Sequence, residues 1–149
     1  MQVDYRNFTY ATNPCAANVP VPAVMRDGAF SYFDRTMGAG FSLSVVTIVR
    51  GSLQPGTQQA VVVLRCDFPI GGTAAAYVFA ERGDGSAKPL GKVADANWGA
   101  EWGAGPAAIQ AQFAHGRLIV SACANTACTQ KATTSYELRA GKLIRTSHA

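Results

Sequence analysis

Residues 60–66 have the sequence AVVVLRC, an apolar run of five residues that Arg65 interrupts. Three of the five are valines, whose β-branched side chains favour strands over helices. A continuous apolar strand, without polar residues at alternate positions, is typical of a strand covered on both faces. We therefore expect a central strand here, and we expect residues 74–80, which include Tyr77 and Phe79, to form its neighbour.

The segments on either side of this strand alternate between apolar and polar residues. In FSLSVVTIVR, residues 41–50, the alternation predicts Phe41, Leu43, Val45 and Val49 on one face. Residues 109–113 and 134–139 alternate in the same way. A period of two over short segments indicates half-buried antiparallel strands.

Pairs of residues suited to tight hairpin turns separate these segments. Each pair ends in glycine, which supplies the positive φ that such turns need. The pairs are Asp27-Gly28, Asp84-Gly85, His115-Gly116 and Ala140-Gly141. Together the patterns predict an all-β fold, an antiparallel β-sandwich or small barrel of about nine or ten strands with hairpin connections.

Two segments fit this pattern less simply. Residues 3–10 change phase midway, and a strand with a bulge at Arg6 or Asn7 would explain the change. Residues 94–108 are the only candidate for a short helix, so at most one is expected.

Length and composition indicate one compact domain over residues 1–149, with 48% apolar and 15% charged residues. No apolar run is long enough to span a bilayer. The formal net charge is +4, from 13 basic and 9 acidic residues. The basic residues are scattered rather than grouped with aromatic residues, which favours a solvated surface over a nucleic-acid interface.

The four cysteines, Cys15, Cys66, Cys123 and Cys128, allow three complete disulfide pairings. Their spacing does not match zinc sites, and the chain has only two histidines, so no metal is expected. We favour pairing Cys15 with Cys66, which would tie the N-terminal segment to the sheet, and Cys123 with Cys128 at a hairpin tip. Disulfides persist in oxidising compartments, so we expect a periplasmic, cell-surface or secreted protein.

The first residues, MQVD, have neither the basic nor the apolar region of a signal peptide. We interpret Met1 as an added start on a mature, truncated chain.

The most unusual segment is NWGAEWGAGP, residues 97–106, which contains both tryptophans. One interpretation is a loop that presents Trp98, Glu101 and Trp102 to a ligand or partner. The other is that the rings pack under the loop as a small core. We expect Trp98 to be buried and Trp102, beside Glu101, to be partly exposed.

Catalytic motifs are absent: the chain has no G-x-S-x-G elbow, no H-E-x-x-H and no phosphate-binding glycine loop. His115 is interpreted as a turn residue. The carboxylates most nearly aligned are Asp95 and Glu101, and a hydrolase using them is an alternative that spacing alone cannot test. No catalytic residue and no cofactor are expected.

Three stretches resemble a family of exported bacterial proteins. They are residues 4–15, which contain DYRNFTY and NPC, residues 60–66, and AYVF at residues 76–79. With the segment Tyr136 to Leu143, they are similar to uncharacterised proteins akin to the LppP/LprE-type lipoproteins. The resemblance implies an envelope location, with a lipid anchor that would be lost with the native N-terminus. Relatives carry an acidic turn before the central strand, whereas residues 52–59 here contain no carboxylate, so calcium is not expected.

These observations predict a non-enzymatic, disulfide-stabilised domain that binds a protein or a small ligand in the bacterial envelope. An inhibitor or immunity protein directed against a secreted enzyme is the first alternative, and a hydrolase is the second.

Overall fold

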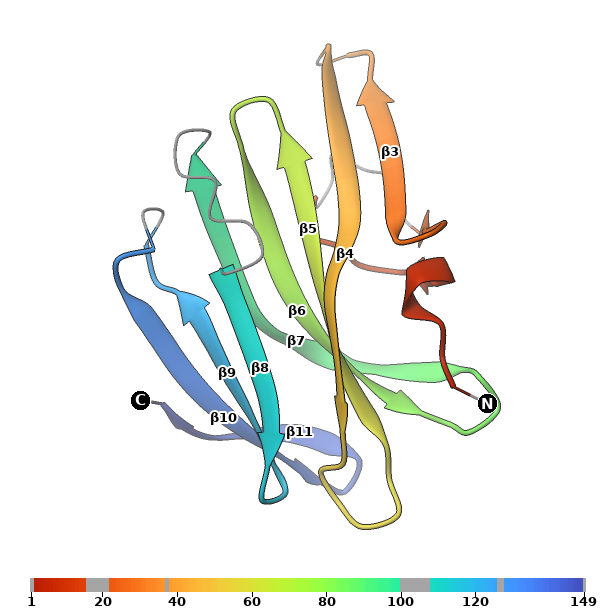
Figure 1. Cartoon of the computed structure of the whole chain (residues 1–149), viewed down its shortest axis with the longest axis vertical. Helices are drawn as coiled ribbons and strands as arrows, with labels where there is room; N and C mark the ends of the chain where they lie inside the picture. Colours follow the sequence, from red (N-terminus) through yellow and green to blue (C-terminus); the bar gives the residue numbers. More distant parts are fainter. Residues whose placement is uncertain (1, 16–21, 37, 100–107, 126–127, 149) are drawn as a thin grey trace.

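The computed structural model describes residues 2–15, 22–36, 38–99, 108–125 and 128–148. Five antiparallel strands form one sheet in chain order, β3-β4-β5-β6-β7, and four form a second, β11-β10-β9-β8 (Figure 1). The third sheet pairs β1 with β2. The bounds are β1 Thr9–Tyr10, β2 Ala23–Val24, β3 Ala29–Asp34, β4 Ala39–Gly51, β5 Gln59–Phe68, β6 Gly71–Glu81, β7 Ala87–Gly99, β8 Ile109–Ala114, β9 Arg117–Cys123, β10 Lys131–Arg139 and β11 Lys142–His148.

This arrangement is an all-β sandwich, as the alternating pattern predicts. The described residues contain eleven strands, slightly more than expected. Two of them, β1 and β2, are only two residues long. The described part of the chain includes no helix that could span a membrane.

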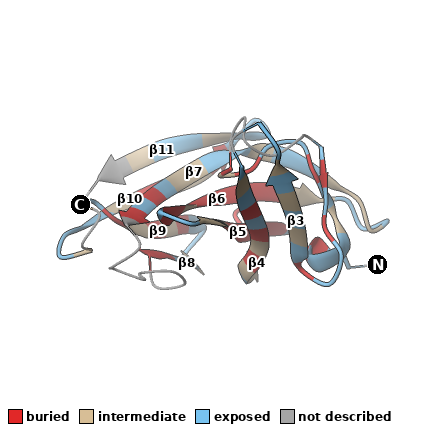
Figure 2. Ribbon diagram, turned by 90° about the horizontal axis from the view of Figure 1, so that it is seen from above, coloured by how far each residue is buried: buried red, intermediate tan, exposed pale blue. Residues whose placement is uncertain are grey.

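The central strand is β5, and it is buried on both faces. Val61 and Val63 pack in the cluster beneath the four-stranded sheet, whereas Val62 and Leu64 pack in the cluster on the opposite face. The buried parts of β5 and β6 run through the middle of the molecule (Figure 2). The continuous valine run therefore follows from two covering layers.

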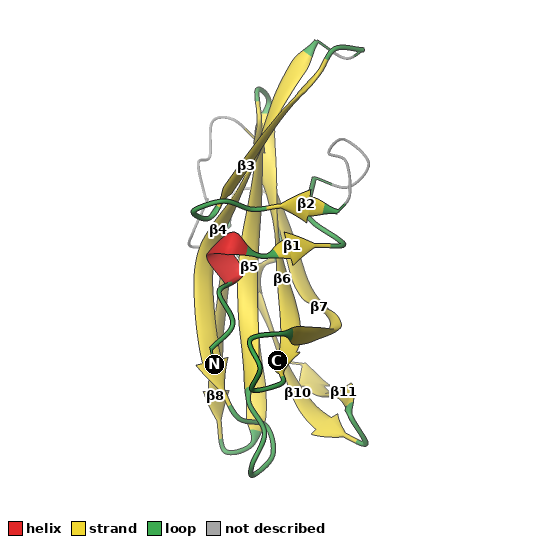
Figure 3. Ribbon diagram, turned by 90° about the vertical axis from the view of Figure 1, so that its right-hand side faces the viewer, coloured by secondary structure: helices red, strands yellow, loops and turns green. Residues whose placement is uncertain are grey.

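The second covering layer is the N-terminal segment. β1 and β2 run across the long strands of the five-stranded sheet (Figure 3). Tyr5 and Tyr10 are fully or almost fully buried against that sheet. The guanidinium of Arg50 lies 5.4 Å from the centre of the Tyr5 ring, and its Nη2 donates a hydrogen bond to the Val3 carbonyl at 2.6 Å.

The predicted tight turns are present. His115-Gly116 and Ala140-Gly141 each form the whole two-residue connection of a hairpin, with positive φ at both positions. Asp27-Gly28 has the same conformation. Asp84-Gly85 lies in a longer loop, residues 82–86, in which the Asp84 carboxylate accepts hydrogen bonds from Ser86.

The expected placement of Val49 is wrong, because β4 contains a bulge. Val45 pairs with Leu64, but Thr47 pairs with Val63, so Val46 is an extra residue. The bulge reverses the alternation after it. Val49 therefore pairs with Val61 and lies on the opposite face from Phe41, Leu43 and Val45.

The expected strand over residues 3–10 is also wrong. Residues Tyr5–Asn7 form a single 3-10 turn, η1, and only Thr9–Tyr10 is a strand. Asp4 stabilises the turn, because its carboxylate accepts hydrogen bonds from the Arg6 backbone N–H and the Asn7 side chain. The phase change in the sequence is the signature of this turn and not of a bulge.

The candidate short helix at residues 94–108 is wrong for residues 94–99, which belong to β7. Their alternation buries Ala96 and Trp98 and exposes Asp95 and Asn97. Residues 100–107 lie outside the described residues.

Both disulfides have the expected pairing. Cys15 and Cys66 are joined with their Cα atoms 5.3 Å apart, and Cys123 and Cys128 with theirs 4.8 Å apart. The first bridge fastens the N-terminal segment to β5, and the second closes the connection between β9 and β10. The chain is therefore a disulfide-stabilised all-β domain.

Candidate functional site

Trp98 lies at the end of β7 and is only 6% exposed. It pairs with Gly72 on β6, and its ring occupies the space that a side chain at position 72 would need. A Cβ atom added to Gly72 would lie 2.5 Å from Cζ2 of the indole. Trp98 therefore packs in the core, as expected for this ring.

Arg65 and Asp67 lie between Trp98 and the surface. The Arg65 guanidinium lies 5.2 Å from the centre of a Trp98 ring. Its Nε donates to both Asp67 oxygens, at 2.9 and 2.8 Å. The side chains of Arg65 and Asp67 are 26% and 40% exposed, so the pair lies at the boundary between core and solvent.

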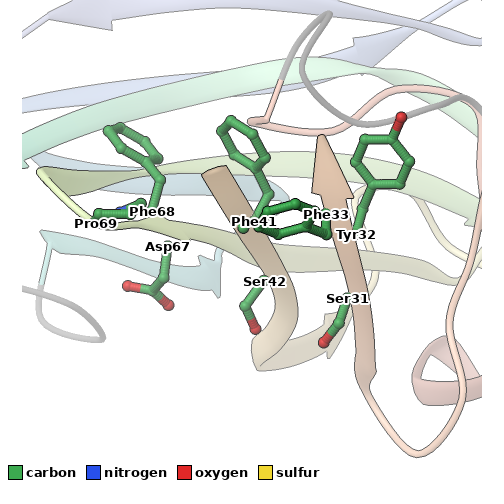
Figure 4. A pocket seen from close by; sticks show the side chains of 9 residues that line it. Ser31, Tyr32, Phe33, Phe41, Ser42, Asp67, Phe68 and Pro69 are labelled. Atoms are coloured by element: carbon green, nitrogen blue, oxygen red, sulfur yellow. The ribbon is translucent and has the colours of Figure 1, made fainter. Parts of the chain in front are cut away.

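Asp67 belongs to a polar row that crosses the sheet. Ser31 on β3 pairs with Ser42 on β4, and Ser42 pairs with Asp67 on β5. Residues paired across antiparallel strands lie on the same face. Both serines are exposed. In Figure 4 the side chains of Ser31, Ser42 and Asp67 lie on one side of the strands, and the rings of Tyr32, Phe41 and Phe68 lie on the other.

The serines, Asp67 and the rings shown in Figure 4 line a hollow where β3 and β5 end and β4 begins. Its volume is ≈ 640 Å³. Phe33, Phe68 and Pro69 also line it, and Phe41 packs against Phe68 with ring centres 6.1 Å apart.

Two large apolar side chains at this end are exposed to solvent. Phe33 is 60% exposed on β3, and Ile70, which follows Pro69 in the turn between β5 and β6, is 80% exposed. We call Phe33, Phe68, Pro69 and Ile70 the apolar end. Sequence reasoning missed it, although an isoleucine between a proline and two glycines in a predicted loop was a signal that the residue has no core position.

A second hollow, also ≈ 640 Å³, lies between residues 8–13 and strands β6 and β7. Its walls include Tyr10, Tyr77 and Phe79, which belong to the core cluster beneath the N-terminal segment. Burial raises the pKa of Tyr77 to about 12. Its aromatic walls Tyr10, Tyr77 and Phe79 are buried, whereas Phe33 and Ile70 at the apolar end are 60% and 80% exposed.

Of the two carboxylates that the sequence suggests for a hydrolase, Asp95 lies in the described part of the chain and Glu101 does not. Asp95 is exposed on β7 and forms an ion pair with Lys92, with Nζ and Oδ2 3.0 Å apart. Glu101 and Trp102 lie outside the described residues. His115 is a turn residue with a φ of 53°.

The turn before β5, residues 52–58, contains no carboxylate, and its side chains form hydrogen bonds within the turn. There the Gln59 side chain accepts a hydrogen bond from the Leu53 backbone N–H at 2.6 Å, and Thr57 donates to the Gln54 carbonyl at 2.7 Å. Within the residues that the structure describes, no group of three or more His, Cys, Asp or Glu side chains could hold a metal ion.

No family model, curated protein or solved structure matches the chain. The resemblance to LppP/LprE-type proteins therefore stays a prediction, and the function must be inferred from the residues themselves.

Proposed function

We propose that the chain is an exported, non-enzymatic binding domain of the bacterial envelope, and that it binds a partner protein through the apolar end. The observation that carries this proposal is the exposure of Phe33 and Ile70, 60% and 80%, beside one hollow. Exposed apolar side chains that gather at one place, with polar residues around them, are typical of interaction sites.

The composition of the hollow supports a protein partner. Aromatic side chains contribute most to protein interfaces, and a polar rim surrounds them. Phe33, which is 60% exposed, and the partly buried Phe68 supply the aromatic part. Ser31, Ser42 and Asp67 supply hydroxyl and carboxylate groups that could form hydrogen bonds with a partner at the rim.

The two disulfides support export. Both are internal to the domain, and the Cys15–Cys66 bridge is buried, with its cysteines 3% and 1% exposed. Disulfides of this structural kind persist in the periplasm and outside the cell, and are rare where glutathione and thioredoxin keep thiols reduced.

Site-specific photo-crosslinking tests the proposal. The photoreactive residue p-benzoylphenylalanine would replace Phe33 or Ile70 in the protein produced in its own cells, and Ile144 would be the control. Ile144 is also an exposed large apolar residue, at 37%, but it lies on β11 in the other sheet. We expect defined adducts from positions 33 and 70 and none from position 144.

Equal labelling at all three positions, or no adduct at 33 and 70, would contradict a binding role for the apolar end. Mass spectrometry of the adduct identifies the partner. If the partner is a secreted enzyme that loses activity on binding, the inhibitor or immunity alternative is the correct form of the proposal.

A further inference from the structure

The outer edge of β3 has unpaired backbone groups. β3 pairs with β4 along one side only, and it is the first strand of its sheet. The Gly28 carbonyl accepts a hydrogen bond from the Val45 N–H at 2.8 Å, so in the alternating antiparallel pattern Phe30 and Tyr32 also bond to β4. The odd-numbered residues of β3 therefore direct their N–H and C=O groups away from the sheet.

Only part of this edge is open. Ala29 exchanges both of its backbone hydrogen bonds with Arg26, at 3.1 Å each. Ser31 and Phe33 have no such partner among the described residues. Their outward N–H and C=O groups lie two residues apart, and this spacing matches another extended backbone.

The other edge of the same sheet differs. β7 contains Pro89, and its pairing with β6 shifts at two places, so it carries two bulges. Proline and bulges are the usual devices that prevent an edge strand from pairing with another chain. β3 has neither, because its pairing with β4 is continuous and its sequence is AFSYFD.

We propose that the β3 edge pairs with the β3 edge of a second copy of this chain, in antiparallel orientation, with Ser31 opposite Phe33 of the second copy. This inference rests on the proposed function, and it names a partner for Phe33, the residue of the apolar end that lies on β3. Of the antiparallel two-fold registers, this one uses both open residues of each copy, and it forms four backbone hydrogen bonds.

Side-chain size favours a second copy as the occupant. In this register each Phe33 ring lies beside a serine of the other copy, on the face where Ser31 and Ser42 are small and exposed. A large side chain thus meets a small one on both sides of the two-fold axis, and Phe33 loses its exposure. On the opposite face Tyr32 meets Tyr32 of the second copy, and aromatic pairs directly across strands are stabilising.

The charges near this edge do not oppose self-association. Arg26 and Arg35 carry two positive charges, and Asp27 and Asp34 carry two negative charges, so the edge is neutral although the whole chain is +4. Two copies can therefore approach through this edge without the repulsion that the net charge causes elsewhere.

Sedimentation velocity over a range of protein concentrations tests the proposal, with Ser31→Pro and Ser31→Ala as matched variants. Proline removes the N–H of residue 31, which points away from the sheet, and it leaves every hydrogen bond to β4 intact. Edge strands tolerate proline at such a position. Alanine removes the hydroxyl and keeps the N–H. We expect the wild type and Ser31→Ala to dimerise with similar Kd, and Ser31→Pro to dimerise at least tenfold more weakly.

A wild-type chain that remains monomeric at millimolar concentration, or a Ser31→Pro variant that dimerises like Ser31→Ala, overturns the inference. Amide hydrogen exchange tests it without a variant, because the Ser31 and Phe33 amides should exchange more slowly as the concentration of wild type rises. If they do not, the strand pairing is wrong. A monomeric chain that still gives an adduct with a different protein at position 33 refutes only the second copy, and the proposed function then stands.

Discussion

Removal of the Cys15–Cys66 disulfide should produce a large and calculable loss of stability. The two cysteines are 51 residues apart, and the chain-entropy relation gives about 4 kcal/mol for a loop of that length. The same relation gives about 2 kcal/mol for the Cys123–Cys128 bridge, whose separation is 5. Domains are typically stable by about 5–15 kcal/mol, so the first bridge supplies a substantial fraction of the total.

The structure adds a second contribution for the longer bridge. Cys15 and Cys66 are both buried, and the segment that the bridge fastens covers one face of the five-stranded sheet. Thr73, which pairs with Cys66, donates a hydrogen bond to the Pro14 carbonyl at 2.8 Å. Loss of the bridge therefore also weakens a layer that the sheet needs on its apolar face.

The measurement is urea denaturation of Cys15→Ala/Cys66→Ala, followed by circular dichroism, with Cys123→Ala/Cys128→Ala as the matched control. We expect the first double variant to lose about twice as much free energy of unfolding as the second. A smaller loss for the long-loop variant than for the short-loop variant would refute the reasoning, because loop length and buried packing both predict the opposite order.

Three further results are expected. Trp98→Ala should lower the free energy of unfolding by about 3–5 kcal/mol, because the indole is buried, and Gly72→Ala should also destabilise the fold, because its Cβ would contact the ring. Urea denaturation measures both effects, and wild-type stability in either variant would be inconsistent with this packing. The free energy of unfolding should fall as pH rises from 10 to 12, because burial raises the pKa of Tyr77 from 10.0 to about 12 and the folded state therefore holds a proton that the unfolded state releases. Thermal unfolding at successive pH values measures the loss of stability, and absorbance at 295 nm follows tyrosine ionisation. A stability that does not change between pH 10 and 12 would contradict the prediction. Gln59→Ala should lower the free energy of unfolding by about 1–3 kcal/mol, because the buried Leu53 N–H loses its acceptor. Gln58 is exposed, so Gln58→Ala should change the free energy of unfolding by under about 0.5 kcal/mol. Equal effects of the two variants in urea denaturation would contradict the role of the hydrogen bond.

The candidate site divides into parts that the sequence could and could not indicate. Trp98 was identified from its unusual segment, and its burial was one of two interpretations. Phe33 and Ile70 were not identified, because an apolar residue in a strand or loop gives no sign of its exposure until the neighbouring layers are in place. Arg65 was visible as a charge in an apolar strand, but its position over Trp98 depends on the pairing of β5, β6 and β7.

The sequence by itself determined the local structure of this protein. Alternation with a period of two, dipeptides suited to positive φ and the valine run of residues 60–64 predict strands, hairpins and a strand covered on both faces, because these properties depend on near neighbours in the chain. The four cysteines restricted the disulfides to three pairings, and the position of Cys15 and Cys66 favoured the correct one.

Only the tertiary structure decided which surfaces remain uncovered. The bulge at Val46 reverses the face of Val49, and one extra residue is not visible in a pattern of alternating side chains. The N-terminal segment forms a turn instead of a strand, because Asp4 caps it and the sheet offers a buried place for Tyr5. The exposed edge of β3 likewise results from the order of strands in the sheet, and that order is set by packing between residues distant in the chain.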